Sequence, residues 1–242
     1  MLQNESVTDI DQSRRVREMF ARIAGRYDLL NHLLSLNIDK RWRREVANTL
    51  RSKPPQGETR ILDVACGTGD LAFTLSENEG AHVTAIDFCR PMLEIGAAKA
   101  SKGSAVIPFI EGDALQLPFA DRSFDAATIA FGLRNLSDLE KGFQELFRVA
   151  KPGGRVVVLE FSKPAVPLLR SLFSLYFTKL LPLLGGVISG SRNAYQYLPD
   201  SVARFPNQQE LATKMNAVGF VNVSYRNLSG GIAAIHVGTR PE

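Results

Sequence analysis

The strongest chemical signal in the sequence is the segment Ile61–Asp70 (ILDVACGTGD), in which an apolar run leads into Gly67 and Gly69. Glycine lets a backbone approach a ligand closely at a tight turn because it has no Cβ atom. Asp87 ends the next apolar run, 20 residues after Gly67. At that spacing a carboxylate can reach the two hydroxyls of a ribose. The pattern therefore predicts a nucleoside site.

Three interpretations of this segment compete. In the first, the glycines make a tight turn and Asp87 ends a strand without any ligand. In the second, Gly67-x-Gly69-x-x-Ala72 matches the dinucleotide fingerprint GxGxxA. In the third, the ligand is S-adenosylmethionine. Asp63 favours the third, because a carboxylate beside the turn repels a pyrophosphate but attracts the ammonium of a methionine moiety.

A further acidic residue follows the third predicted strand, in Gly112-Asp113-Ala114. Asp113 at the carboxyl edge of a parallel sheet can accept a hydrogen bond from an adenine amino group, which again favours S-adenosylmethionine. No group of residues resembles a metal site. The two cysteines, Cys66 and Cys89, form no CxxC pair, and we expect a reduced, cytoplasmic setting.

These residues need a scaffold that brings several strand ends to one edge. Apolar strands and helices alternate along the chain, with strands at 60–65, 82–87, 106–111, 124–131 and 155–161 and helices at 70–76, 91–100 and 139–149. A helix at 208–217 then precedes two strands at 220–226 and 232–238, which a glycine-containing loop joins as an antiparallel hairpin. The predicted fold is α/β, a doubly wound, mostly parallel seven-stranded sheet of Rossmann-like type with an antiparallel last strand.

Residues 1–51 are expected to form an N-terminal helical cap. Its first helix has an apolar face at Val16, Met19, Phe20, Ile23 and Ala24, and a second helix at 40–50 follows. The Pro- and Gly-rich segment 52–60 separates this cap from the main domain, 60–242. That domain carries an apolar insertion at 164–190, which charged residues interrupt, so we expect no membrane-spanning helix.

The motifs DVACGTG, AID, EGDA and KPGG, in this order, resemble those of class I S-adenosylmethionine-dependent methyltransferases. Longer blocks narrow the resemblance: 16–44, FGLRNLSD (131–138), RVAKPGGRVVVLEFSKP (148–164) and YQYLPDSVARFPNQQEL (195–211). Together they are similar to the ubiquinone/menaquinone biosynthesis C-methyltransferases, over residues 16–238. The resemblance implies methylation of a polyprenylated hydroquinone ring. The expected acceptor is demethylmenaquinol, with the benzoquinol of ubiquinone synthesis as a further candidate. The resemblance also places cofactor contacts on Thr68, Asp87, Asp113 and Ala114.

Methylation of a ring carbon is easier when a neighbouring hydroxyl is ionised. Arg134 and Asn135 follow the fourth strand at the cofactor edge, and a guanidinium lowers a nearby pKa by roughly 1–3 units. The structural alternative for Arg134 is an ion pair with Asp138. His236, on the last strand, is a weaker candidate for a general base.

Tyr27 lies with Asp28 and Asn31 in a segment that is expected to fold over the cofactor and to supply a hydrogen bond. In the alternative, this segment is a packed helix whose core residues are Leu29, Leu30, Leu33 and Leu34.

Composition limits the remaining functions. With Lys plus Arg at 29 and Asp plus Glu at 25, the formal charge is +4, which allows weak contact with an anionic membrane. The apolar insertion could receive a prenyl tail there. The sequence has no long basic run with interleaved aromatic residues, so we expect no nucleic-acid partner. A methyltransferase acting on RNA or on another small molecule, and a non-catalytic cofactor-binding protein, remain alternatives, and a homo-oligomer is compatible with the sequence.

Overall fold

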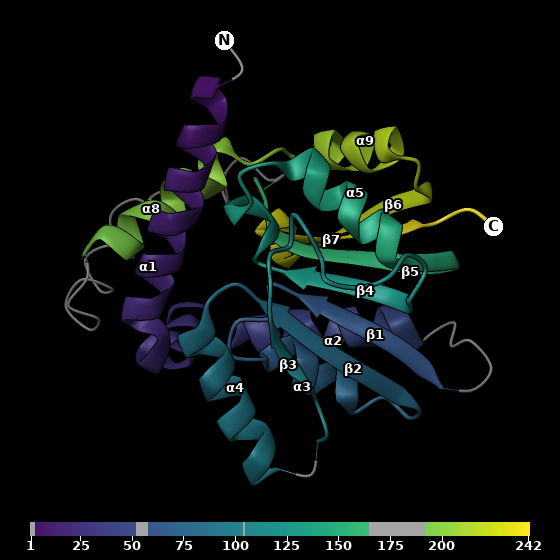
Figure 1. The fold of residues 1–242 in the computed structure, drawn as a ribbon, viewed down its shortest axis with the longest axis horizontal. Helices are drawn as coiled ribbons and strands as arrows, with labels where there is room; N and C mark the ends of the chain where they lie inside the picture. The colour runs from purple at the N-terminus through teal and green to yellow at the C-terminus, as the bar shows by residue number, and fades with distance from the viewer. Residues whose placement is uncertain (1–2, 52–57, 104, 165–191) are drawn as a thin grey trace.

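The computed structural model describes residues 3–51, 58–103, 105–164 and 192–242. Its centre is a seven-stranded sheet in the order β3-β2-β1-β4-β5-β7-β6 (Figure 1). The strands are β1 (Thr59–Val64), β2 (Ala81–Asp87), β3 (Phe109–Glu111), β4 (Phe124–Ala130), β5 (Ala150–Phe161), β6 (Val221–Leu228) and β7 (Ala233–Thr239). Strands β1 to β5 pair in parallel, and β7 runs antiparallel to both β5 and β6. The predicted fold class is confirmed.

Helices cover both faces of this sheet. On one face lie α5 (Leu139–Val149) and α9 (Gln208–Val218), and on the other α2 (Ile38–Arg51) and α3 (Asp70–Ser76) (Figure 1). Along β5, Val156 and Val158 pack toward α5 and α9, whereas Val157 and Leu159 pack toward α2 and α3. Both faces of the strand are therefore buried at 156–159, which explains the four consecutive apolar residues there.

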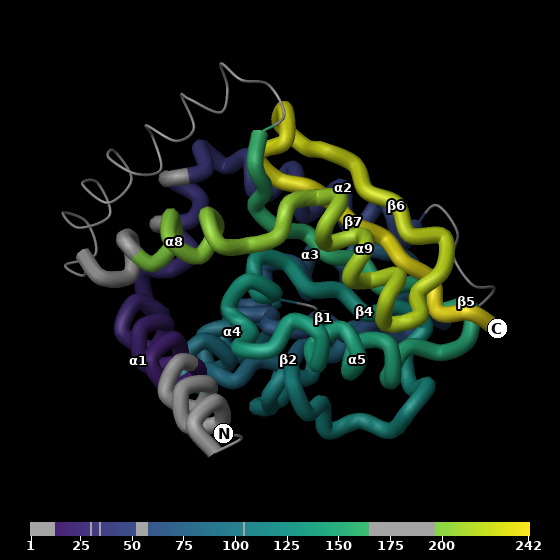
Figure 2. Tube along the Cα trace, turned by 90° about the horizontal axis from the view of Figure 1, so that it is seen from above, coloured from purple at the N-terminus to yellow at the C-terminus, as the bar shows by residue number. Residues whose placement is uncertain are grey.

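Three further α-helices complete the described part of the fold. Helix α1 (Gln3–Leu34) runs next to α4 (Arg90–Lys102), and α8 (Arg192–Arg204) lies beside α1 (Figures 1 and 2). Helix α2 belongs to the main core, because Trp42 is buried and its indole N–H donates to Ser229 Oγ at 3.0 Å. In the described part of the chain, no helix is both long and apolar enough to cross a bilayer.

The structure differs from the sequence expectations at several places. Strand β3 is shorter than predicted, with Val106 93% exposed ahead of it. Helix α8 has no counterpart among the predicted elements, and it contains Pro199, a residue that disfavours helix interiors. Leu29 and Leu33 are exposed at 63% and 49%, so the expectation that they are core residues is wrong. Nearly all of the apolar insertion falls in 165–191, outside the described residues.

Candidate active site

A cavity lies at the carboxyl ends of β1, β2 and β4. The strand order reverses between β1 and β4, and open α/β sheets bind their ligands at such a point. The cavity has about 1030 Å³ of empty space, its open mouth included. Its lining comes from the ends of these strands, from the loop after β3 and from the segment after β4. Helices contribute Arg43 of α2, residues in the first turns of α3 and α4, and Ser13, Phe20 and Tyr27 on one face of α1.

Asp87, at the end of β2, is held rigidly in the cavity wall. Its Oδ2 accepts a hydrogen bond from the Gly67 backbone N–H at 2.8 Å, and its Oδ1 accepts one from the Cys89 N–H at 2.8 Å. Burial raises the pKa of Asp87, and these backbone hydrogen bonds oppose the rise. Each oxygen keeps a second lone pair, so the carboxylate can still accept hydrogen bonds from two neighbouring hydroxyls.

Asp63, on β1, is buried in the same wall and lacks a full set of partners. Thr128 Oγ1 donates to its Oδ1 at 2.8 Å, whereas its Oδ2 has no hydrogen-bond partner among the described residues. Burial raises the pKa of Asp63 to about 7, although Thr128 and the nearby Arg43 charge oppose this. A buried carboxylate oxygen without a donor fits a cationic ligand group in the cavity.

The glycine turn combines two different requirements for glycine. Gly67 has φ +56° and lines the cavity, as expected. Gly69 has φ +88° and is not among the lining residues, and a Cβ there would lie 2.7 Å from the Phe109 ring. Gly69 is thus required by its backbone conformation and by packing against Phe109.

Thr68, in the same turn, lines the cavity but uses its hydroxyl within the protein. Its Oγ1 donates to Asp28 Oδ1 of α1 at 2.5 Å. Lys99 Nζ of α4 lies 2.6 Å from Asp28 Oδ2 and 3.0 Å from Asp70 Oδ1. Thr68 was predicted to contact a cofactor, and its hydroxyl is engaged in a hydrogen bond that holds α1 over the turn.

The loop after β3 supplies the last of the predicted cofactor residues. Asp113 and Ala114 both line the cavity. Asp113 Oδ1 accepts a hydrogen bond from the Leu115 N–H at 2.8 Å, which fixes the carboxylate at the rim. The structure thus brings Gly67, Thr68 and Asp87 together with this pair around a single space.

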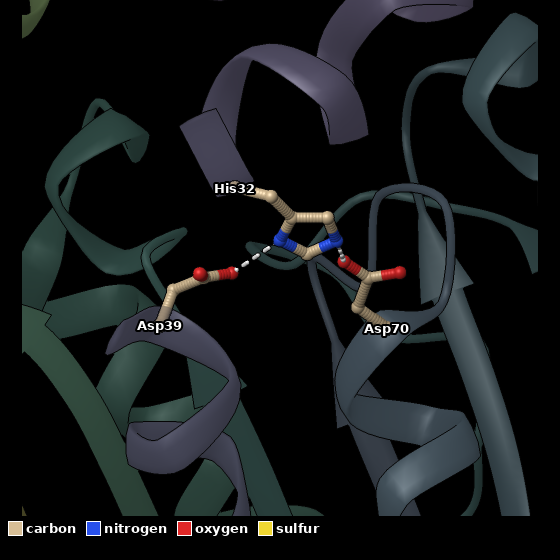
Figure 3. Close-up of side chains that lie close together, drawn as sticks. All are labelled: His32, Asp39 and Asp70. Carbon is tan, nitrogen blue, oxygen red and sulfur yellow. Dashed lines mark hydrogen bonds and ion pairs between the residues drawn. The ribbon is translucent and has the colours of Figure 1, made fainter. Parts of the chain in front are cut away.

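Beside the turn, the side chains of His32, Asp39 and Asp70 converge (Figure 3). Their atoms that could bind a metal ion lie within 4.8 Å of one another. His32 Nδ1 lies 2.8 Å from Asp39 Oδ2, and its Nε2 lies 3.5 Å from Asp70 Oδ2. Arg43 forms an ion pair with Asp39 and approaches Asp70 at 3.9 Å. Burial would raise the pKa of Asp39, but a hydrogen bond from Ser35 and the Arg43 charge hold it below its usual value. Arg43 thus already provides a cation for these carboxylates.

The residues predicted to act on the substrate are placed differently relative to the cavity. Tyr27 lies beside the glycine turn, since a Cβ at Gly67 would be 3.8 Å from its ring. Tyr27 and Asn135 line the cavity, whereas Arg134 is not among the lining residues. Burial raises the pKa of Tyr27, and the charge of Arg134 is the largest effect opposing this. Tyr197 of α8 donates from its hydroxyl to Asn135 Oδ1 at 3.1 Å, which orients the amide.

Arg134 lies behind this wall in a buried ion pair. Its Nη1 is 2.8 Å from Glu160 Oε1, and the Arg134 backbone N–H donates to Glu160 Oε2 at 3.3 Å. The guanidinium Nε is buried without a partner among the described residues. The alternative pairing with Asp138 is wrong, since Asp138 caps α5 by accepting from the Lys141 N–H.

The structure changes the view of two residues, Glu160 and His236. Sequence reasoning did not single out Glu160, although a lone carboxylate inside the apolar run VVVLEF indicates a buried, paired charge. His236 is buried in β7, where its Nε2 lies 2.9 Å from the Gln208 carbonyl oxygen, and it is not among the cavity residues. Burial lowers the pKa of His236, so a general-base role at this cavity is not supported.

Comparison with known proteins gives a consistent picture. The model of the ubiE/COQ5 methyltransferase family matches residues 7–240. A demethylmenaquinone methyltransferase of Thermus thermophilus is 52% identical over 92% of this chain and 100% of its own length. A ubiquinone/menaquinone biosynthesis C-methyltransferase of a Geobacter species is 46% identical, covering 95% of this chain and 98% of the relative.

Solved structures with a similar fold are more distant in sequence. A possible histamine N-methyltransferase of Thermotoga maritima superposes with a TM-score of 0.64 at 20% identity, covering 92% of this chain and 98% of that one. A phosphoethanolamine N-methyltransferase of Haemonchus contortus, solved with S-adenosylmethionine, has a TM-score of 0.59 at 15% identity and covers 82% of this chain and 53% of that one. At such identities the likeness extends to the fold alone.

Proposed function

The chain belongs to the ubiE/COQ5 methyltransferase family, and from that premise we propose that it methylates a ring carbon of a prenylated hydroquinone, with S-adenosylmethionine as donor. Relatives named demethylmenaquinone methyltransferase, at 45% to 52% identity, favour a demethylmenaquinol as the acceptor. The observation that carries the proposal is the cavity, which two buried carboxylates line. Asp63 has an oxygen without a described partner, whereas Asp87 is held by backbone N–H groups.

The cavity residues suit the three parts of the proposed cofactor. Asp63, with one unpartnered oxygen, would receive the ammonium group, and Asp87, with two free lone pairs, would receive the ribose hydroxyls. Asp113 and Ala114 at the rim would hold the adenine. When bound, the cofactor supplies a methyl group on a positively charged sulfur.

The remaining residues act on the acceptor. Tyr27 and Asn135 present a phenol and an amide to the cavity and would orient a ring hydroxyl by hydrogen bonding. Arg134 stands behind them, so its charge favours loss of the hydroxyl proton, while Glu160 moderates that charge. An ionised hydroxyl makes the adjacent ring carbon nucleophilic. That carbon would accept the methyl group of the bound cofactor. The new carbon–carbon bond would form as the sulfur–methyl bond breaks, the sulfur would leave as a neutral thioether, and the ring carbon would then release its proton to solvent.

Methyl transfer measured by product mass tests this function. The full chain is incubated with S-adenosylmethionine and a short-chain demethylmenaquinol, and a product heavier by one CH₂ unit is expected. Absence of that product, with binding of S-adenosylhomocysteine intact, would favour the non-catalytic alternative. Methylation of RNA in its place would favour the nucleic-acid alternative.

The role of Arg134 needs a variant that still folds. Removing the arginine alone leaves the buried Glu160 charge without a partner. Replacing both residues with methionine removes the pair together, which is often neutral for stability. We expect Arg134→Met/Glu160→Met to fold, to bind S-adenosylhomocysteine normally and to lose at least 100-fold in turnover. Near-normal turnover would show that the guanidinium has no part in the chemistry.

A further inference from the structure

The end of α1 and the turn into α2 carry an apolar surface that nothing in the described fold covers. We define this apolar corner as Leu29, Leu33, Leu36 and Ile38, which are 63%, 49%, 78% and 39% exposed. Leu29 and Leu33 are four residues apart, so they share one face of α1, and Leu36 and Ile38 follow in the turn into α2 and at its start. Single exposed apolar residues are common, but four within ten residues of one another are a candidate interaction surface.

The apolar corner faces away from the candidate active site. Ser13, Phe20 and Tyr27, at intervals of seven residues, form the face of α1 that lines the cavity. At about 100° per residue, Leu29 and Leu33 lie roughly 200–240° around the helix from Tyr27. The exposed leucines are therefore not part of the cavity wall, and the proposed chemistry gives no reason for them.

The backbone at the corner also indicates a function outside the fold. Leu36 has φ +53° and Asn37 has φ +60°, and the Asn37 N–H donates to the His32 carbonyl oxygen at 2.8 Å. Glycine or asparagine usually occupies such a left-handed position after a helix. A leucine there costs free energy, and at 78% exposure Leu36 regains little of it by packing within the protein.

Positive charge follows the apolar corner directly along the chain. Lys40, Arg41 and Arg44 are exposed on the first turns of α2. The acids close to them in sequence are already paired, because Asp39 is buried against Arg43 and Glu45 lies 3.0 Å from Arg226. Exposed leucines that are followed along the chain by exposed basic side chains match the interface of an anionic bilayer, where apolar groups enter the acyl region and cations contact headgroups.

We propose that the apolar corner, with Lys40, Arg41 and Arg44 beside it, docks the protein on an anionic lipid bilayer. The leucines and Ile38 enter the interface and the three basic side chains contact lipid phosphates. The inference rests on the proposed function only in that a prenylated acceptor would reside in the same bilayer. Binding to lipid itself does not depend on any reaction.

Co-sedimentation of the full chain with vesicles tests the docking directly. Vesicles of phosphatidylcholine with about 30% phosphatidylglycerol should bind the protein at low salt, and vesicles of phosphatidylcholine alone should bind it weakly. Each basic residue near an anionic surface contributes roughly a factor of five, so Lys40→Gln/Arg41→Gln/Arg44→Gln should bind about 100-fold more weakly. Leu33→Ser/Leu36→Ser should lose at least tenfold.

Matched controls come from exposed residues elsewhere on the molecule. Val106→Ser and Lys214→Gln remove an exposed apolar and an exposed basic side chain, and both should bind like the wild type. All variants should keep the wild-type melting temperature within a few degrees. Equal binding of the corner variants and the wild type, or no binding of the wild type at low salt, would overturn the proposal.

Activity on two forms of one acceptor separates this inference from the proposed function. The corner variants should turn over a short-chain, water-soluble demethylmenaquinol at the wild-type rate and lose activity on a long-chain quinol embedded in vesicles. If the wild type methylates neither form, the proposed function fails while the vesicle result still stands. If Leu33→Ser/Leu36→Ser converts a wild-type dimer to monomers without changing vesicle binding, the corner is a self-interface and the proposal is wrong.

Discussion

Replacing Asp63 with asparagine should make the protein more stable at neutral pH while weakening cofactor binding. The wild-type carboxyl has its pKa raised by burial to about 7, from 3.8 for the ordinary group. The folded state therefore holds this proton more tightly than the unfolded chain does. Between about pH 4 and pH 7 the free energy of unfolding must fall as pH rises, because the unfolded chain binds fewer protons in that window.

The size of the effect follows from the two pKa values. A difference of about 3 units corresponds to roughly 4 kcal/mol of stability lost by the wild type across the window. The asparagine side chain of the variant has no titrating proton, so this loss is absent. Asp63→Asn and the wild type should therefore have similar stability near pH 4 and differ by up to about 4 kcal/mol at pH 8. For a chain of this size that is a rise in melting temperature of about 8–16 °C.

Urea unfolding and calorimetric binding of S-adenosylmethionine measure both consequences. In the wild type, affinity should fall about tenfold per pH unit below pH 7, because the ammonium group of the ligand needs the ionised carboxylate. The variant should bind weakly and with little pH dependence. The reasoning is refuted if the stability difference between the two proteins is the same at pH 4 and pH 8, or if Asp63→Asn binds the ligand normally.

Other variants test other parts of the site. Glu160→Gln should destabilise the protein by about 3–5 kcal/mol in urea unfolding, because it leaves the buried Arg134 charge uncompensated; a loss under about 1 kcal/mol would contradict a buried pair. Asp28→Asn should cost at most about 1 kcal/mol, since its ion pair is partly exposed, yet stopped-flow measurements should show cofactor release several-fold faster; unchanged release would mean that α1 does not gate the turn. Gly69→Ala should lose about 2–4 kcal/mol, because its Cβ would meet the Phe109 ring at a positive φ, and a stability equal to that of the wild type would show that the turn relaxes easily.

Most strands and helices of the sheet domain could be predicted from local sequence alone. Strands buried on both faces are continuously apolar, and α3 and α5 begin and end at the predicted residues, 70–76 and 139–149. The turn at Gly67, with Asp87 at the next strand end, could be found because both belong to one β-α-β unit, in which spacing along the chain determines position in space. Asp113 could be predicted for the same reason, because it follows the next strand at the same edge of the sheet.

Tertiary structure decided what the sequence left open. Arg134 had a candidate partner four residues away, yet it pairs with Glu160, which lies 26 residues along the chain and becomes its neighbour only when β4 and β5 pair. Likewise, the leucines near the end of α1 fit either a packed or an exposed face by periodicity alone. Periodicity states which residues share a face of a helix, but burial depends on what packs against that face, and contacts between distant segments determine this.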